Sequence, residues 1–349
     1  MTGGAGFVGA AVCLTLAERH PEAEVVALDS LKRRGSELNL ARLREAGVTF
    51  VHGDVRQRED LLGLEPVGAI VECSAEPSVL AGMGSGADFV VQTNLLGAHN
   101  CLELARRDGA QFLFLSTSRV YPVKPQTELV LREEETRFAL ESDQPFPGAS
   151  ERGIAEHFPL EGARTLYGAT KLAAELLVTE YADSFGLAAV IDRCGVIAGP
   201  WQMGKVDQGV FTHWLLAHYA QRPLTYIGYG GAGKQVRDLL HVADLCELIL
   251  EQLADPGAWA GATVNVGGGV QGSLSLRETT ELCREFTGNH VPVEPVLENR
   301  PGDVPYYASD CARLFGRSAW RPRRTPRVIL EDTYHWIHDN ERAVLAALG

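Results

Sequence analysis

Three glycines near the amino end constrain the fold of this chain more than any other feature. They are Gly3, Gly6 and Gly9, spaced as Gly-x-x-Gly-x-x-Gly, and an apolar helical run to His20 follows them. Glycines at this spacing permit a tight turn whose backbone N–H groups point at an anionic ligand at the start of a helix. A glycine-rich start is also compatible with a flexible leader, so the next residues must decide.

The following apolar segment, Glu24–Leu28, is typical of a β-strand and ends at Asp29, twenty residues after Gly9. A carboxylate at this distance binds the ribose hydroxyls of an adenine dinucleotide. The combination therefore predicts a dinucleotide site. Asp29 favours NAD, because a carboxylate repels the 2′-phosphate of NADP, although the basic run Lys32–Arg34 leaves NADP open as an alternative.

The strand expected before the glycine loop has only Met1 and Thr2 to form it. This strand lies at the centre of a parallel sheet, and its loss would leave two neighbouring strands unpaired and apolar surface exposed. We therefore expect the natural chain to begin upstream of Met1. The alternative is a sheet that lacks most of its first strand.

Strand-like and helix-like segments alternate along the first half of the chain. Alternation of this kind predicts an α/β fold with a Rossmann-type, doubly wound parallel sheet, whose ligands bind at the carboxyl ends of the strands. At one such end, Asp54 is placed to reach an adenine amino group. The further predicted strands are Val48–His52, Ala69–Cys73, Gln111–Leu115 and Ala188–Asp192, and the predicted helices are Asn94–Arg107 and Tyr167–Phe185.

After residue 193 the composition changes to Gly-rich turns and short alternating runs. We expect residues 1–193 to form the nucleotide-binding domain, with 236–260 returning to it. Residues 194–349 are then mainly a smaller C-terminal α/β domain that binds the substrate and ends in an amphipathic helix, Ile329–Leu348. An acidic insertion at 122–165 is predicted to consist of loops and short helices, as is typical of segments that cover a site.

Composition excludes several classes of partner. The formal net charge of −13 argues against nucleic acid and against an anionic membrane surface. No apolar run reaches the ~18 residues of a membrane-spanning helix, and we see no signal peptide. The seven cysteines are scattered without a metal-binding spacing, which predicts reduced thiols in a cytoplasmic protein and no metal site.

Tyr167 and Lys171 begin the predicted helix Tyr167–Phe185 and, four residues apart, share one of its faces. A nearby ammonium favours the phenolate and lowers the pKa of a tyrosine from about 10, which makes the side chain usable as a general acid/base. This spacing alone is more typical of an ordinary solvated helix turn. Thr117 ends a predicted strand where its hydroxyl can bond the same substrate oxygen, although hydroxyls there also cap the next turn.

The ordered set of these residues resembles the extended short-chain dehydrogenase/reductases, specifically the nucleotide-sugar epimerase/dehydratase family, over essentially the whole chain. Later motifs in the set are Arg193, Gly199-Pro200, Arg237-Asp238 and Arg300. Finer segments resemble the CDP-paratose 2-epimerase subfamily, in which a basic loop follows the ribose aspartate of an NAD enzyme. These segments are Asp29–Gly35, Phe50–Asp54, Ser116–Tyr121, Asp207–Gly209 and Lys234–Asp238.

The resemblance implies three groups of site residues. The catalytic residues are Thr117, Tyr167 and Lys171. The cofactor-binding residues are Gly3, Gly6, Phe7, Val8, Gly9, Asp29, Ser30, Arg34, Asn39, Asp54, Val55, Ser74, Ala75, Asn94, Ser116, Tyr167 and Lys171. The substrate-binding residues are Glu76, Ser118, Arg193, Gln202, Gln208, Arg237 and Arg300.

Two of the substrate residues carry a general chemical argument. The guanidinium forks of Arg237 and Arg300 suit a diphosphate, although a lone arginine is more often part of a surface ion pair. The chain also departs from the family. Val196–Ala198 stand where many relatives carry Asn-x-Tyr, and Glu76 stands where relatives often have a neutral residue, which puts a carboxylate near the sugar.

The resemblance implies an NAD-dependent epimerase that oxidises a carbon of a nucleotide sugar, preferably a CDP-sugar, to a ketone and reduces it again on the opposite face. Related 4,6-dehydratases need an Asp-Glu pair after the threonine, where this chain has Ser118 and Arg119. We rank a UDP-sugar 4-epimerase second and a dehydratase third. A non-catalytic NAD-binding protein is the alternative from another class. By analogy, a homodimer or homotetramer is expected through the helices Asn94–Arg107 and Tyr167–Phe185.

Overall fold

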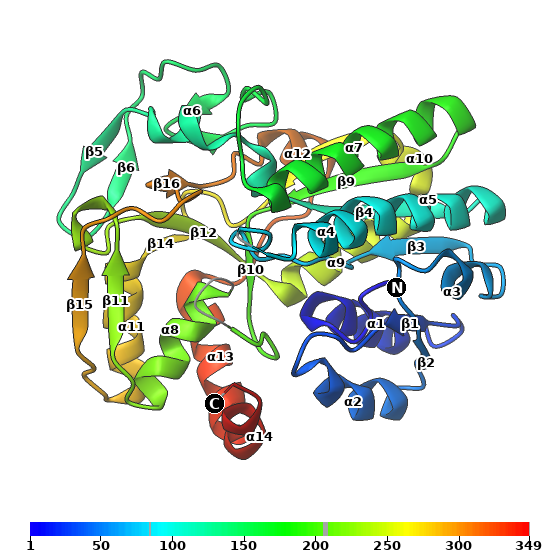
Figure 1. The fold of residues 1–349 in the computed structure, drawn as a ribbon, viewed down its shortest axis with the longest axis horizontal. Helices are drawn as coiled ribbons and strands as arrows, with labels where there is room; N and C mark the ends of the chain where they lie inside the picture. Colours follow the sequence, from blue (N-terminus) through cyan, green and yellow to red (C-terminus); the bar gives the residue numbers. More distant parts are fainter. Residues whose placement is uncertain (84, 205–208, 349) are drawn as a thin grey trace. The chain divides into compact units, whose positions relative to one another are not determined.

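The computed structural model describes residues 1–83, 85–204 and 209–348, and the chain divides into two compact units (Figure 1). The first unit contains Met1–Val120, Leu166–Arg193 and Leu245–Thr263. The second contains Tyr121–Thr165, Cys194–Asp244 and Val264–Gly349. Within the described residues, no helix combines the length and the apolar character needed to cross a membrane.

The first unit is built on a Rossmann-type sheet. Thr2 bridges in parallel to Leu28 on one side and to Glu72 on the other, so the residues Met1 and Thr2 lie between two strands that would otherwise be separate. Their carbonyl oxygens accept hydrogen bonds from Leu28 (2.8 Å) and Cys73 (3.2 Å). The strands are, in spatial order, β2 (Thr49–His52), β1 (Val26–Asp29), the Met1–Thr2 segment, β3 (Ala69–Glu72), β4 (Gln111–Thr117), β9 (Ala189–Cys194) and β13 (Ala262–Val266).

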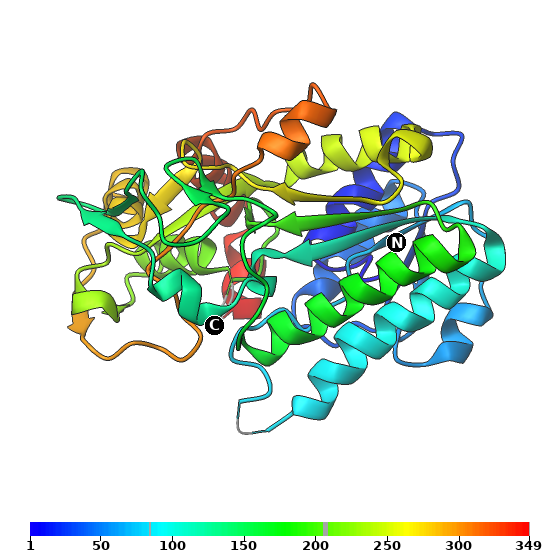
Figure 2. The same cartoon turned by 90° about the horizontal axis from the view of Figure 1, so that it is seen from above.

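Helices cover both faces of this sheet because both faces of its central strands are apolar. On one face α5 (Gly97–Asp108) and α7 (Leu166–Phe185) lie side by side (Figure 2), and their apolar residues pack on Ile70, Phe112 and Phe114 of the sheet. On the other face α1 (Phe7–Arg19) and α9 (Val242–Ala254) are joined by an ion pair. The remaining helical segments are η1 (Ser36–Leu38), α2 (Asn39–Glu45), α3 (Arg58–Leu62), α4 (Ala87–Val91), the π-helical η2 (Gln92–Leu96), η3 (Ser118–Val120) and α10 (Pro256–Trp259).

The second unit is arranged around β12 (Val236–His241). This strand pairs in parallel with β10 (Val196–Ala198) and β16 (Tyr306–Tyr307), and antiparallel with β14 (Ser273–Ser275). Apolar residues of α8 (Val210–Tyr219) and α13 (Pro326–Asp339) bury Leu239 of β12. The other elements are α6 (Val123–Thr127), β5 (Leu131–Glu133), β6 (Phe138–Leu140), β7 (Ala149–Ser150), β8 (Gly153–Ile154), β11 (Leu224–Ile227), η4 (Tyr229–Gly231), α11 (Leu276–Thr287), β15 (Val293–Val296), α12 (Ala312–Arg317) and α14 (Glu341–Leu348).

Three sequence predictions differ from this fold. The prediction of a single terminal helix was wrong: α13 ends at Asp339, because the backbone of Asn340 (φ −117°, ψ 22°) leaves the helical conformation, and α14 begins at Glu341. The insertion at 122–165 holds, besides α6, the antiparallel pairs β5–β6 and β7–β8. The helix expected from Asn94 starts with a π-turn, a feature common at functional sites.

The compact units also divide the chain differently from the expected domains. Residues 121–165 belong with the second unit, because the β5–β6 hairpin and the residues around it bond to that unit. Of the segment 236–260, only the part from Leu245 on belongs with the first unit.

Candidate active site

At Gly4 and Gly9 the glycine loop is too tightly closed for any side chain. A Cβ atom added at Gly9 would lie 2.1 Å from the carbonyl oxygen of Gly3, and one added at Gly4 would lie 2.7 Å from Cα of Ala27. Gly3 itself has a positive φ of 63°. The loop thereby places the start of α1 at the carboxyl end of the sheet. This cradle of backbone N–H groups at a helix start fits the pyrophosphate of a dinucleotide.

Two side chains of the predicted cofactor set fix Ala5 in the middle of this loop. Asp29 accepts hydrogen bonds from the N–H of Ala5 (3.1 Å) and the N–H of Leu31 (2.8 Å). Asn39, which is fully buried, donates to the carbonyl oxygen of Ala5 (2.9 Å). Asp29 thus stands beside the loop, where a ribose is expected. Asn39 supports the loop, and its contact with the cofactor stays a prediction. Other predicted cofactor residues are half-buried or exposed, namely Phe7, Val8, Ser30, Arg34, Ser74 and Ala75.

At the predicted adenine end, charged side chains gather around an aromatic ring. Both oxygens of Asp54 accept from Arg56, at 2.5 to 3.0 Å, and this hydrogen bonding lowers the pKa of Asp54. The Cζ of Arg56 lies 4.9 Å, and the Nζ of Lys32 3.7 Å, from the ring centre of Phe89. Lys32 is therefore engaged by an aromatic face, and Val55 beside Asp54 is buried.

Asn94 clamps the loop after β3 to the helix α7. Its Oδ1 accepts from the N–H of Glu76 (2.8 Å), and its Nδ2 donates to the carbonyl oxygen of Glu76 and to Oγ1 of Thr170 (both 3.2 Å). The Asn94 side chain is fully buried. These bonds hold the loop that contains Ser74 and Ala75, and the contact of Asn94 with the cofactor stays a prediction.

The three predicted catalytic residues lie in the first unit, where α7 packs on β4 and η3. Thr117 is the last residue of β4, and Tyr167 and Lys171 lie in the first two turns of α7. All three are buried, with 8, 9 and 2% of their surface exposed. The Thr117 hydroxyl also accepts from the N–H of Arg119 (3.2 Å), so it caps η3 as well. The structure thus brings the strand end and the start of the helix together.

The ammonium of Lys171 lies over two adjacent strands. Its Nζ is 3.4 Å from Oε2 of Glu72 on β3 and 3.8 Å from the ring centre of Phe114 on β4, and these two residues are partners in the sheet register. Burial raises the pKa of the Glu72 carboxyl, and Lys171 opposes this rise. Glu72 is not among the residues predicted from the sequence. Its only signal was a single charge that ends an otherwise apolar strand.

A second buried network lies one turn further along α7. The carboxylate of Glu175 accepts from Nε (3.1 Å) and Nη2 (2.7 Å) of Arg193 and from the hydroxyl of Ser116 (2.5 Å). The Arg193 and Glu175 side chains are 7% and 4% exposed. The guanidinium of Arg193 thus forms a buried ion pair inside the first unit, and its contact with the substrate stays a prediction. Ser116, expected at the cofactor, ties the end of β4 to α7.

The predicted substrate residues of the second unit are also engaged. Arg237 forms an ion pair with Asp303 (2.6 Å) and is 12% exposed. This agrees with the alternative that the arginine is part of an ordinary ion pair. Arg300 is half-buried, and its positive charge acts on His213. Burial lowers the pKa of the His213 imidazole most, and the charge of Arg300 lowers it further. The Gln202 amide donates to the carbonyl oxygen of Ile197 (2.8 Å), which braces a turn. The remaining predicted residue, Gln208, lies outside the described residues.

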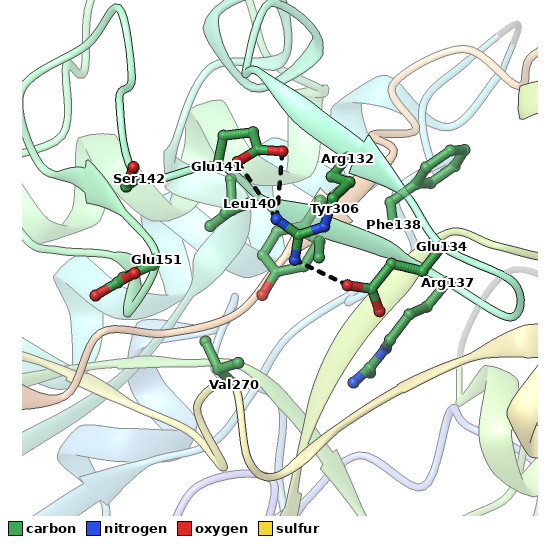
Figure 3. Close-up of a pocket in the computed structure, with 11 residues that line it drawn as sticks. Arg132, Glu134, Arg137, Phe138, Leu140, Glu141, Ser142, Glu151, Val270 and Tyr306 are labelled. Atoms are coloured by element: carbon green, nitrogen blue, oxygen red, sulfur yellow. Dashed lines mark hydrogen bonds and ion pairs between the residues drawn. The ribbon is translucent and has the colours of Figure 1, made fainter.

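A cavity of about 430 Å³ opens within the second unit, between the β5–β6 hairpin, the β7–β8 turn and β16 (Figure 3). Arg132 projects over it, held by Glu134 (2.9 Å) and Glu141 (3.3 Å). Tyr306 lines it, and since the register pairs Tyr306 with Val236, it lies on the face of β12 opposite to Arg237. The charged lining residues Arg132, Glu134, Arg137, Glu141 and Glu151 give no excess of positive charge for a diphosphate.

The described residues contain no group of three or more His, Cys, Asp or Glu side chains that could hold a metal ion. All seven cysteines are free thiols, and six of them are buried.

Comparison with known proteins places the chain in a family. The model of the NAD dependent epimerase/dehydratase family matches residues 1–267. The CDP-paratose 2-epimerase of Salmonella typhi is 27% identical over 96% of this chain and 98% of its own length. The dTDP-glucose 4,6-dehydratase of Streptomyces antibioticus is 30% identical, over 97% and 92%.

Among solved structures, the UDP-glucose 4-epimerase of Thermus thermophilus in complex with NAD superposes with a TM-score of 0.75 and 25% identity, over 97% of each chain. The glycine cradle and Asp29 fit the same cofactor. The chain is therefore an enzyme of the NAD-dependent epimerase/dehydratase family, and NAD is its cofactor.

Proposed function

We propose that this enzyme is a nucleotide-sugar epimerase and, more narrowly, a CDP-paratose 2-epimerase. It oxidises one sugar carbon to a ketone and reduces it again on the opposite face. Relatives of both reaction classes are similar to the chain at comparable identity. Overall similarity therefore supports the family, and the choice of reaction rests on residues of the site.

The observation that carries the choice of epimerase is the pair of residues after Thr117. Ser118 and Arg119 form the start of η3, and Arg119 donates its N–H to the Thr117 hydroxyl. Elimination of water from a sugar needs a general acid that protonates the leaving hydroxyl. In the dehydratases that this chain resembles, an Asp-Glu pair supplies it, and here neither residue is a carboxylic acid. This supports reversible oxidation without elimination.

In this proposal Tyr167, as phenolate, removes the proton of the sugar hydroxyl, and it returns the proton when the ketone is reduced. Thr117 donates a hydrogen bond to the same oxygen. Lys171 favours the phenolate of Tyr167 and binds the ribose next to the nicotinamide. When bound, NAD supplies the reversible acceptance of hydride. The protein fixes the geometry and the protonation state of the groups around the reacting carbon.

We further propose that the first unit binds NAD and the second the nucleotide sugar. Arg237 and Arg300 carry the positive charge suited to a diphosphate, and Asp303, the ion-pair partner of Arg237, would orient its guanidinium. The preference for CDP rests on the segments that resemble the CDP-paratose 2-epimerase subfamily. Glu76 would place a carboxylate beside the sugar, since the Asn94 clamp fixes its backbone.

The substrate proposal is tested by incubating the purified enzyme with CDP-paratose, UDP-glucose and dTDP-glucose in parallel and determining the product stereochemistry by NMR. We expect CDP-paratose alone to be inverted at C2. Turnover of UDP-glucose alone would replace this proposal with a UDP-sugar 4-epimerase. Loss of water from dTDP-glucose would identify a dehydratase, and bound NAD without turnover of any sugar would favour a non-catalytic NAD-binding protein.

We also infer that the protein works in the cytoplasm as a homodimer or homotetramer. Its free, mostly buried cysteines support a reducing compartment. On the outer surface of the first unit, Leu96 is 49%, Leu176 67% and Phe185 55% exposed. These residues belong to η2 and α7, within the helices expected to pair. A Leu176→Asp variant should shift the mass measured by light scattering to that of the monomer, and an unchanged oligomer would contradict this interface.

A further inference from the structure

Lys171 and Glu72 form an ion pair that is almost completely buried. The two side chains are 2% and 1% exposed, and the contact between Nζ and Oε2 is 3.4 Å. The second oxygen of Glu72, Oε1, is also buried, and the described residues offer it no hydrogen-bond partner. A carboxylate in this state is incompletely satisfied, and such a group calls for an explanation.

Stability does not explain the pair. Two charges that leave water lose hydration, and their attraction repays it only when the geometry is excellent and the remaining lone pairs are satisfied. Here one oxygen has no partner among the described residues and the contact is long. The effect of the pair therefore lies in the predicted catalytic site to which Lys171 belongs.

Few other ionisable groups face Glu72. The thiols of Cys73 and of Cys101 on α5 lie near it, and burial raises the pKa of both, so both are neutral in the working pH range. On the neighbouring Met1–Thr2 segment the amino group of Met1 is bonded to the carbonyl oxygen of Val26 (2.8 Å). Lys171, on α7, is thus the charged group on which Glu72 acts.

We propose that Glu72 is a positioning residue for Lys171: its carboxylate anchors the ammonium over β3 and β4 and takes up part of the charge that acts on Tyr167. This rests on the proposed roles of Tyr167 and Lys171. An ammonium paired with a carboxylate stabilises a nearby phenolate less than a lone ammonium does. With Glu72 present, the pKa of Tyr167 is therefore higher than it would be if Lys171 had no paired carboxylate.

The test is a pH titration of tyrosine ionisation in the NAD-bound protein, followed by ultraviolet difference absorbance and requiring no sugar substrate. Comparison with Tyr167→Phe isolates the transition of Tyr167. Its window is clear of Tyr181 and Tyr306, because burial raises the pKa of each to about 12. We expect the Tyr167 transition in Glu72→Gln about one pH unit below that of the wild type.

A control variant removes the carboxylate of another ion pair of the first unit. Asp108 is 3% exposed, pairs with Arg107 and accepts from the N–H of Val67, just before the amino end of β3. Asp108→Asn removes an ion pair whose arginine is 32% exposed, so it should lower stability by less than about 1 kcal/mol, and it should leave the Tyr167 transition in place. Glu72→Asp keeps the charge but withdraws it by one methylene, and we expect a smaller shift in the same direction.

The outcomes separate the two proposals. If the wild type and Tyr167→Phe titrate alike below pH 10, Tyr167 is not an activated phenol and the proposed function fails. If a Tyr167 transition is present but Glu72→Gln leaves it unmoved, or Asp108→Asn moves it equally, the role of Glu72 is overturned while the proposed function stands. Should Glu72→Gln not fold, an unshifted transition in Glu72→Asp overturns it equally.

Discussion

Two networks of arginine or lysine with glutamate differ sharply in their surroundings. Under α7, the pairs Lys171–Glu72 and Arg193–Glu175 are 1 to 7% exposed. In the β5–β6 hairpin, Arg132 pairs with two glutamates at 39 to 54% exposure. The pairing chemistry is the same in both. What differs is how far the charged groups are removed from water.

This difference decides what each network can do. An exposed pair contributes about 0–1 kcal/mol and is screened by salt, so it leaves its side chains free to move. Removing one partner of a buried pair costs about 3–5 kcal/mol, because a charge is left without compensation. The buried network therefore fixes where Lys171 and the end of β4 lie, which is what a catalytic site requires. The hairpin network fixes nothing comparable.

The largest expected effect compares two buried tyrosines. Tyr167→Phe should lower turnover by roughly 10²–10⁴-fold, the contribution of a general acid/base, while the protein keeps its bound NAD. Tyr306→Phe should leave turnover unchanged, since the described residues give the Tyr306 hydroxyl no hydrogen-bond partner. Steady-state kinetics and the absorbance of retained cofactor measure both. Equal losses in the two variants would remove the distinction between the regions.

The next effect concerns stability. Glu175→Ala leaves the Arg193 guanidinium buried without its carboxylate, and we expect unfolding to become easier by about 3–5 kcal/mol. Glu141→Ala in the hairpin should change the unfolding free energy by less than about 1 kcal/mol. Urea denaturation of both proteins gives the comparison. A small effect at Glu175 would show that the buried network can rearrange.

Two buried aspartates, one in each unit, sharpen the comparison through pH. Burial raises the pKa of Asp192 to about 7, opposed by a hydrogen bond from Gln252, and that of Asp238 to about 6, opposed by hydrogen bonds from Ser309 and Gly269. In the unfolded chain an aspartate titrates near 4. The raised pKa therefore stabilises the fold fully below about pH 4, and this contribution is lost as the pH rises through 7.

The Asp192→Asn variant should lose this pH dependence. Relative to wild type it should gain up to roughly 4 kcal/mol between pH 4 and 7, and Asp238→Asn should gain less. Thermal or urea unfolding across this range measures the slope. A steeper slope in Asp192→Asn than in wild type would contradict the assignment.

The smallest effect is expected at Arg132. Arg132→Ala removes both hairpin ion pairs, which are exposed, so the unfolding free energy should fall by less than about 1 kcal/mol, and high salt should abolish the difference. A loss of several kcal/mol that survives high salt would mean that the hairpin network is as constrained as the buried one.

The sequence predicted those parts of the site that depend on local spacing. Gly3, Gly6 and Gly9 indicate a closed loop, and Asp29 follows it at the distance that one βα unit imposes. Tyr167 and Lys171 were predicted as a pair because residues four apart on a helix lie on the same face. Such patterns depend only on residues that are close in sequence, so they can be recognised without the tertiary structure.

The parts that the sequence did not reveal depend on partners far away along the chain. Glu72 and Lys171 are 99 residues apart, and neither sits in a pattern that points to the other. The ion pair of Arg193 with Glu175 was not predicted, because an isolated arginine gives no sign of a buried carboxylate on a nearby helix. The end of α13 at Asp339 follows from the non-helical backbone of Asn340, which helical periodicity does not encode.

The central claim is that Tyr167 and Lys171 serve a reversible oxidation in which the same hydride leaves and returns. The most direct measurement uses CDP-paratose carrying deuterium at C2, with the product analysed by mass spectrometry and NMR. We predict an inverted C2 that retains the deuterium, in a product of unchanged mass. Exchange of the label with solvent, or a product lighter by one water, would contradict the account.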